Sequence, residues 1–153
     1  MKAERISKPA FSVIGKEGST AEGEGFIQRL WAEANAHFAQ VQPFAVTVDG
    51  QPAACWGLMS DFSRSFQPWE DGFSKGLYLA GIECTPDARA EGWTVWTAPA
   101  AEYVRVECED GYPFREGLRY LKEQGLTLAG AAYDHTDLRT GKSYLYFPVT
   151  RLK

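Results

Sequence analysis

Apolar residues along the chain follow two periods, one typical of helices and one typical of strands. Between residues 26 and 41 they recur every three or four positions, with Phe26, Leu30 and Phe38 on one side. This spacing predicts an amphipathic helix of about four turns. The helix should end before Pro43, because proline cannot continue it.

Shorter apolar or alternating segments predict strands. We expect these strands over 10–17, 53–59, 76–84, 92–97, 102–108, 127–133 and 143–149. A second helix is predicted between Pro113, which suits a first helical position, and Gly125, which suits a C-terminal cap. The segments 61–75 and 134–141 contain the polar, glycine and proline residues of loops.

The order of these elements repeats along the chain. A β-α-β-β unit at about 9–84 is followed by one connecting strand and a second unit at about 102–150. Each copy has three strands and one helix, too little to cover its own sheet. We therefore predict a single α+β domain in which both copies share one antiparallel sheet. Both helices would lie on one face and leave a ligand groove between the repeats on the other.

Composition and charge exclude several classes of protein. The net charge is -4 without Lys or Arg clusters longer than a pair, so nucleic acid is not an expected partner. No apolar run approaches the ~20 residues of a membrane helix, and the N-terminus lacks the apolar stretch of a secretory signal. Three cysteines without CxxC spacing indicate a reducing, cytoplasmic setting. The two histidines share no ligand spacing, so neither metal nor cofactor is expected.

The aromatic content of 14% needs an explanation, and a family resemblance provides one. The ending YLYFPV (144–149) resembles the closing strand of the GyrI-like effector-binding domain, typically Glu-x-Tyr-x-Pro-hydrophobic. The segment APAAEYV (98–104) resembles the Ile-Pro-Ala-x-x-Tyr motif of that family. WGLMSDF (56–62) and GLYLAGIE (76–83) resemble a subgroup of single-domain members. The resemblance extends from Phe11 to Val149.

The resemblance implies a groove that binds bulky, flat, hydrophobic and often cationic compounds. In this family, aromatic rings stack on the ligand and buried carboxylates balance its charge. Some free-standing members are similar to hydrolases that open a strained cyclopropane in DNA-alkylating natural products. This chain has Tyr144 where the closing strand of the family often carries Glu, so an acid in the pocket has to come from another position.

Glu83 is the leading candidate for that acid, since it ends the apolar strand GLYLAGIE. A carboxylate among rings suits either a general acid or base or the partner of a cationic ligand. The alternative is a strand-end Glu that faces water or pairs with an Arg. The candidate ligand-binding residues are Trp56, Met59, Phe66, Trp69, Glu83, Trp93, Tyr103, Tyr133, Tyr144 and Tyr146. Each has a purely structural alternative, because tyrosine suits sheets, Met59 suits a core and the rings of 61–75 can plug a sheet edge as well as form a lid.

Three functions are compatible with these residues. The first is a stand-alone protein, monomeric or homodimeric, that binds or senses a hydrophobic small molecule in the groove. The second is a hydrolase that opens a strained ring, with Glu83 as general acid or base and Tyr103 or Tyr146 orienting a water or stabilising the leaving group. The third is an inhibitor that binds a partner protein and has no ligand, which a groove filled by its own side chains would favour.

Overall fold

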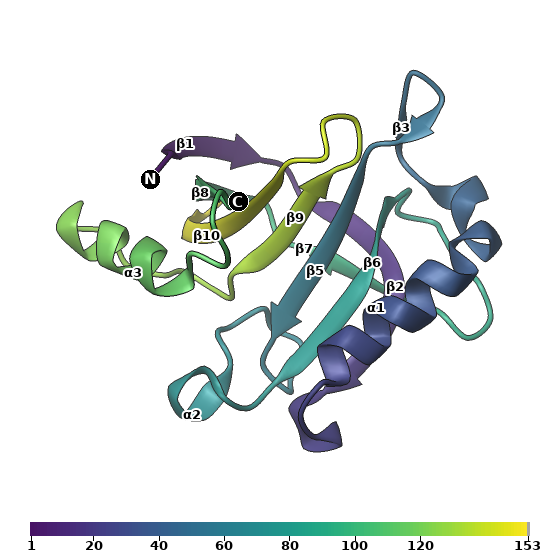
Figure 1. The fold of residues 1–153 in the computed structure, drawn as a ribbon, viewed down its shortest axis with the longest axis horizontal. Helices are drawn as coiled ribbons and strands as arrows, with labels where there is room; N and C mark the ends of the chain where they lie inside the picture. Colours follow the sequence, from purple (N-terminus) through teal and green to yellow (C-terminus); the bar gives the residue numbers. More distant parts are fainter. Residues whose placement is uncertain (153) are drawn as a thin grey trace.

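The protein forms one curved antiparallel sheet of eight strands with its two longer helices on one face (Figure 1). The computed structural model describes residues 1–152. The sheet strands are β1 (Ala3–Lys8), β2 (Phe11–Ser19), β5 (Ala54–Ser60), β6 (Leu77–Cys84), β7 (Thr94–Ala98), β8 (Ala101–Glu107), β9 (Tyr133–Asp137) and β10 (Ser143–Arg151). The helices are α1 (Phe26–His37), α2 (Glu70–Phe73) and α3 (Phe114–Glu123), with short 3-10 turns at Thr20–Glu22, Phe38–Gln40 and Gln42–Phe44. Strands β3 (Thr47–Val48) and β4 (Gln51–Pro52) form a small separate hairpin.

The order of the strands reflects the duplication. The sheet runs β1-β8-β10-β9-β5-β6-β2-β7, so β2-α1-β5-β6 forms one half and β8-α3-β9-β10 forms the other. The halves meet where β5 pairs with β9. The edge strands are exchanged, because β1 precedes β2 yet pairs with β8, whereas β7 precedes β8 yet pairs with β2. The predicted α+β fold is therefore confirmed, and the exchanged edges tie the halves together.

Both helices lie on the same face of the sheet, as predicted, and we call this the helix face. Helix α1 buries Leu30 against Tyr78 of β6, and α3 buries Leu121 against Phe147 of β10. Successive side chains of a strand point to opposite faces. The strand residues that contact the helices therefore show which alternate residues of each strand point toward the helix face. Figure 1 shows α1 crossing over β6 and β2, with α3 on the other side of the β5–β9 seam.

The opposite face, which we call the aromatic face, carries a closed cluster of rings. Its large members are Phe11, Trp56, Trp96, Tyr103, Tyr133 and Tyr146, all less than 9% exposed. They come from β2, β5, β7, β8, β9 and β10, so the sheet curls until its distant strands share one core. Two paired glycines, Gly15 of β2 and Gly81 of β6, lie where the two strands approach closely. A side chain at Gly15 would overlap the backbone of Ala80, and a side chain at Gly81 would overlap the backbone of Ile14, so both positions require glycine.

Two regions differ from the sequence prediction. The predicted strand 127–133 is wrong: residues 126–132 are irregular, and β9 begins only at Tyr133 and runs through the predicted loop. The reason is that β9 is a polar segment, YDHTD, that takes its place through pairing with β5 and β10 rather than through apolar alternation. Strand β1, with the equally polar sequence AERISK, was not predicted either.

Among residues 1–152 no helix combines the length and apolar character needed to cross a bilayer. The three cysteines Cys55, Cys84 and Cys108 are all free thiols. Burial raises the pKa of both Cys55 and Cys84 to about 11. Since the thiolate is the reactive form, these two cysteines are suited to packing rather than to nucleophilic chemistry.

Candidate functional site

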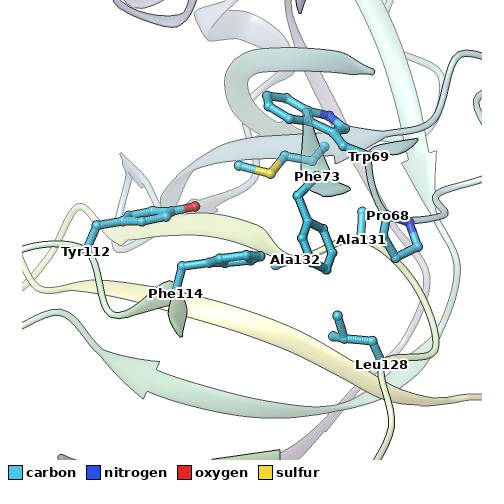
Figure 2. Close-up of a pocket in the computed structure, with 9 residues that line it drawn as sticks. Pro68, Trp69, Phe73, Tyr112, Phe114, Leu128, Ala131 and Ala132 are labelled. Carbon is cyan, nitrogen blue, oxygen red and sulfur yellow. The ribbon is translucent and has the colours of Figure 1, made fainter. Parts of the chain in front are cut away.

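An apolar cavity of about 150 Å³ lies on the helix face, between the two halves of the molecule (Figure 2). We call it the helix-face pocket. It is lined by Met59, Pro68, Trp69, Phe73, Tyr112, Phe114, Leu128, Ala131 and Ala132. The first half contributes β5 and the 61–75 segment, and the second contributes the start of α3 and the irregular chain before β9. The pocket thus lies on the face that carries the helices. The sequence predicted a groove on the opposite face, and this cavity is not there.

One wall of the helix-face pocket is the 61–75 segment, which is held in an unusual backbone conformation. Arg64, Phe66, Asp71 and Phe73 all have φ between 53° and 67°, which costs non-glycine residues roughly 1–3 kcal/mol each. The Trp69 indole N–H anchors the segment by donating to a carbonyl of β6 over 2.8 Å. The wall of the pocket is therefore a segment whose backbone is strained at four positions and held in place by contacts with the sheet.

Aromatic rings form the rim of the pocket. The Phe73 and Phe114 rings meet edge to face with centroids 5.3 Å apart, and Tyr112 stacks on Phe114 at 6.2 Å. Phe73 is 44% and Tyr112 is 53% exposed, and exposed apolar side chains that gather around a cavity are typical of a binding site. Figure 2 shows Tyr112 and Phe114 on one side facing Phe73 and Trp69, with the Tyr112 hydroxyl directed inward. The rim therefore offers several ring faces to a ligand.

A carboxylate, that of Asp134, lies next to this pocket on the helix face. Asp134 is two residues beyond the pocket residue Ala132, which packs in the helix-face cluster just before β9, and it pairs with Gly57 of β5. Its Oδ2 accepts a hydrogen bond of 2.7 Å from the Tyr78 hydroxyl. That hydroxyl in turn accepts the Trp31 indole N–H over 3.0 Å, which directs the tyrosine proton toward Asp134. Asp134 Oδ1 is shielded from solvent and has no hydrogen-bond partner.

Burial raises the pKa of Asp134, although the Tyr78 and Tyr112 hydroxyls oppose this shift by favouring the ionised form. Burial also raises the pKa of Tyr78 well above its usual value, and the neighbouring Asp134 charge adds to the effect. A negative charge at Asp134 is therefore costly in the free protein. A positive charge placed beside it would reduce that cost.

The strand residues predicted to bind ligand are gathered on the aromatic face. Trp56, Glu83, Tyr103, Tyr133, Tyr144 and Tyr146 all belong to this face. The Trp56 ring lies 4.9 Å from that of Tyr146, and Phe66 closes the cluster edge-on to Tyr133 at 6.3 Å. Side chains thus fill the region where the sequence predicts the groove, which favours the third function, a protein-binding inhibitor. A ligand role for these residues stays a prediction.

Glu83 is part of a polar contact at the edge of this cluster. Its Oε1 accepts the Trp56 indole N–H over 2.8 Å and lies 3.4 Å from Lys8 Nζ. The Lys8 ammonium also lies 4.5 Å from the centre of the Phe11 ring. The carboxylate is therefore already paired within the protein, whereas Asp134 Oδ1 is not.

The remaining predicted residues separate into two places. Met59 and Trp69 line the helix-face pocket. Trp93 lies elsewhere, with its ring stacked on Phe38 at 6.0 Å and its indole N–H donating to Gln40 over 2.9 Å.

Sequence reasoning missed Asp134, Tyr78, Tyr112, Phe114 and Leu128. A usable signal was present at Asp134, a lone acid directly after the apolar segment LAGAAY in a chain that lacks the family's Glu at position 144.

His135 gives this region a testable pH dependence. Burial lowers the pKa of His135 to about 4, and the Lys8 charge acts in the same direction. Below pH 6.5 the unfolded chain takes up a proton that the folded protein resists, so stability falls as the pH drops from 6.5 toward 4. We expect His135→Gln to remove about 1–2 kcal/mol of the stability difference between pH 7 and pH 5.

Urea denaturation at the two pH values measures this effect. His37→Gln is the matched control, because His37 is exposed on α1. Asp134 acts in the opposite direction, since its raised pKa lets the folded protein take up a proton first. The test therefore compares His135→Gln and His37→Gln with the unmodified protein. If the difference in stability between pH 7 and pH 5 is the same in His135→Gln as in the unmodified protein, the prediction is contradicted.

Solved structures with the same fold are found among known proteins. SAV2435 bound to tetraphenylphosphonium is 16% identical, with a TM-score of 0.66 over 98% of this chain and 94% of that chain. The EcmrR C-terminal domain is 13% identical, with a TM-score of 0.66 over 99% and 98%. A hydrolase from Listeria innocua is 18% identical, with a TM-score of 0.51 over 97% and 92%. No protein-family model and no curated protein sequence matches the chain. These similarities show that the fold is that of GyrI-like effector-binding domains.

Proposed function

We propose that this protein binds a hydrophobic, aromatic cation in the helix-face pocket and that Asp134 balances the charge of the ligand. The observation that carries the proposal is the unpartnered, solvent-shielded Oδ1 of Asp134 beside a cavity walled by aromatic rings. A protein of this fold bound to the bulky cation tetraphenylphosphonium adds support. The protein would act as a sink for such compounds or as a ligand-dependent partner of another protein.

Two interactions would stabilise such a ligand. The ring faces of Tyr112, Phe114 and Phe73 at the rim attract a cation, with roughly 0.5–2 kcal/mol per favourable contact. The Asp134 carboxylate, costly when ionised without a partner, gains a counter-charge on binding. A neutral molecule of the same shape would receive only the apolar contribution.

The test is fluorescence titration with a panel of aromatic cations that includes tetraphenylphosphonium, each beside a neutral analogue. We expect Asp134→Asn to raise the Kd of the cations at least tenfold and to leave the Kd of the neutral analogues unchanged. The substitution removes the negative charge of the side chain and keeps its shape. Glu83→Gln is the matched control, an acid removed from the opposite face.

The control also separates the two faces. If Glu83→Gln weakens cation binding and Asp134→Asn does not, the ligand binds on the aromatic face, as the sequence predicts. That result would overturn the helix-face proposal. Failure of every cation to bind would leave the protein-binding function, which the filled aromatic face favours.

A hydrolase that opens a strained ring is the second candidate, and the observation favouring it is the likeness to the hydrolase from Listeria innocua. Glu83 would take a proton from a water that attacks a ring carbon. The electrons of the broken carbon–carbon bond would pass to a conjugated acceptor in the substrate, which is then protonated, with Tyr103 or Tyr146 as positioning residues. Incubation with cyclopropane-bearing alkylators and mass spectrometry tests this function. A product 18 Da heavier that disappears in Glu83→Gln would support it, and unchanged substrate would exclude it.

A further inference from the structure

The hydrogen bonds around Asp134 define what its free oxygen can accept. Trp31 donates to Tyr78 and Tyr78 donates to Oδ2, so this side of the carboxylate is occupied and fixed in direction. Oδ1 is a buried acceptor without a donor. Leaving such a group without a donor is unfavourable, and a donor supplied by a ligand would remove that cost.

Access to Oδ1 is restricted by the neighbouring strand and by Tyr112. The paired residue on β5 is Gly57, where even a methyl group would overlap the Tyr78 hydroxyl and lie 2.9 Å from Oδ2. That side is therefore closed. The Tyr112 hydroxyl lies near the Asp134 carboxyl group, where it lowers the pKa of that group, and the same residue lines the pocket. A ligand would reach Oδ1 from the pocket by passing this hydroxyl, which makes no hydrogen bond to Oδ1.

The size of the cavity limits the apolar part of the ligand. A cavity of about 150 Å³ admits one benzene-sized ring. Ala132, in the pocket wall, and Asp134, the second residue of β9, are two residues apart along the chain, a separation of at most roughly 7 Å. A ring in the pocket and a charged nitrogen at Oδ1 would therefore be joined by a short alkyl chain.

We propose that the preferred ligands of this pocket are arylalkylamines, and that high-affinity binding requires at least one N–H on the charged nitrogen. This inference rests on the proposed function and specifies its ligand. A protonated amine donates an N–H to the carboxylate at about 2.7–2.9 Å. A quaternary ammonium presents only methyl groups, which keep the charge farther away and leave Oδ1 without a donor.

A methylation series of 2-phenylethylamine tests the requirement. The primary amine and its N-methyl, N,N-dimethyl and N,N,N-trimethyl forms are all cations at pH 7 and become steadily more apolar. The first three retain an N–H when protonated and the last has none. We expect the first three to bind with similar Kd in isothermal titration calorimetry and the trimethyl form to bind at least tenfold more weakly.

Two variants localise the effect. Asp134→Asn should remove the difference at the last methyl group, whereas Tyr112→Phe, which keeps the ring and removes only the hydroxyl, should retain it. The unmodified protein alone already decides the question. Equal or tighter binding of the trimethyl form would overturn the inference.

The series also separates this inference from the proposed function. Asp134-dependent binding of tetraphenylphosphonium without binding of any phenylethylamine would overturn the ligand class and leave the proposed function standing. Absence of binding for both would overturn both.

Discussion

Replacing Trp56 with alanine should lower the free energy of unfolding by about 3–5 kcal/mol, the range for truncation of a large buried ring. Trp56 is 1% exposed, and its ring lies 4.6 Å from Phe11 and 4.3 Å from His135. The substitution leaves a cavity at the centre of the aromatic face. It also removes the indole N–H that holds Glu83, so the carboxylate loses a buried donor.

Urea denaturation followed by far-ultraviolet circular dichroism measures the loss. Trp93→Ala is the control, a tryptophan that is only partly buried and stacks on Phe38 at the side of the molecule. It should cost less than half as much. A loss below about 1 kcal/mol for Trp56→Ala would mean that the aromatic face is loosely packed, and a groove there would again be reasonable.

Local pattern was sufficient for most of the fold. Helices α1 and α3 and strands β2, β5, β6 and β10 have an apolar period or a continuous apolar run, and the repeat of their order indicates the shared sheet. Strands β1 and β9 have neither, because most residues of each are polar. They are strands because partners distant in sequence, β8 for β1 and β5 for β9, supply the hydrogen bonds.

The site was harder to predict, for a different physical reason. Strands β5 and β6 are buried on both faces. The two-residue alternation therefore shows which side chains share a face with Trp56, but it does not show which of the two faces has an open pocket. Packing decides that: Phe66 and Phe11 fill the aromatic face, while the space between the 61–75 segment and the start of α3 on the helix face is left unfilled. Asp134 was not predicted as a site residue, because a buried acid within a polar strand resembles a loop residue in sequence.

The aromatic content thus has two roles on two faces. The rings on the aromatic face are buried against one another and stabilise the curled sheet. Phe73 and Tyr112 instead remain half exposed at the pocket rim, where they contribute little to the stability of the free protein. Exposed rings beside an unpartnered carboxylate oxygen are a better indication of a binding site than the larger number of buried rings.

Gly57→Ala should both destabilise the protein and weaken ligand binding, because this glycine leaves space for the Tyr78–Asp134 pair. A methyl group there would overlap the Tyr78 hydroxyl, and that ring, fully buried under α1, has no free space to enter. Overpacking of this kind costs about 1–3 kcal/mol, and a broken hydrogen bond to Asp134 adds about 1 kcal/mol or more.

We therefore expect about 3 kcal/mol lower stability for Gly57→Ala and at least tenfold weaker binding of aromatic cations, measured by urea denaturation and by titration of the fraction that remains folded. Gly18→Ala is the matched control, since its methyl group would meet only the ends of two side chains, Leu30 and Glu22, and should cost markedly less. Weaker binding with unchanged stability would mean that Tyr78 moves aside and turns Asp134 away from the ligand. Loss of stability with unchanged affinity would contradict a role for Asp134 in binding, because the substitution disturbs its carboxylate directly.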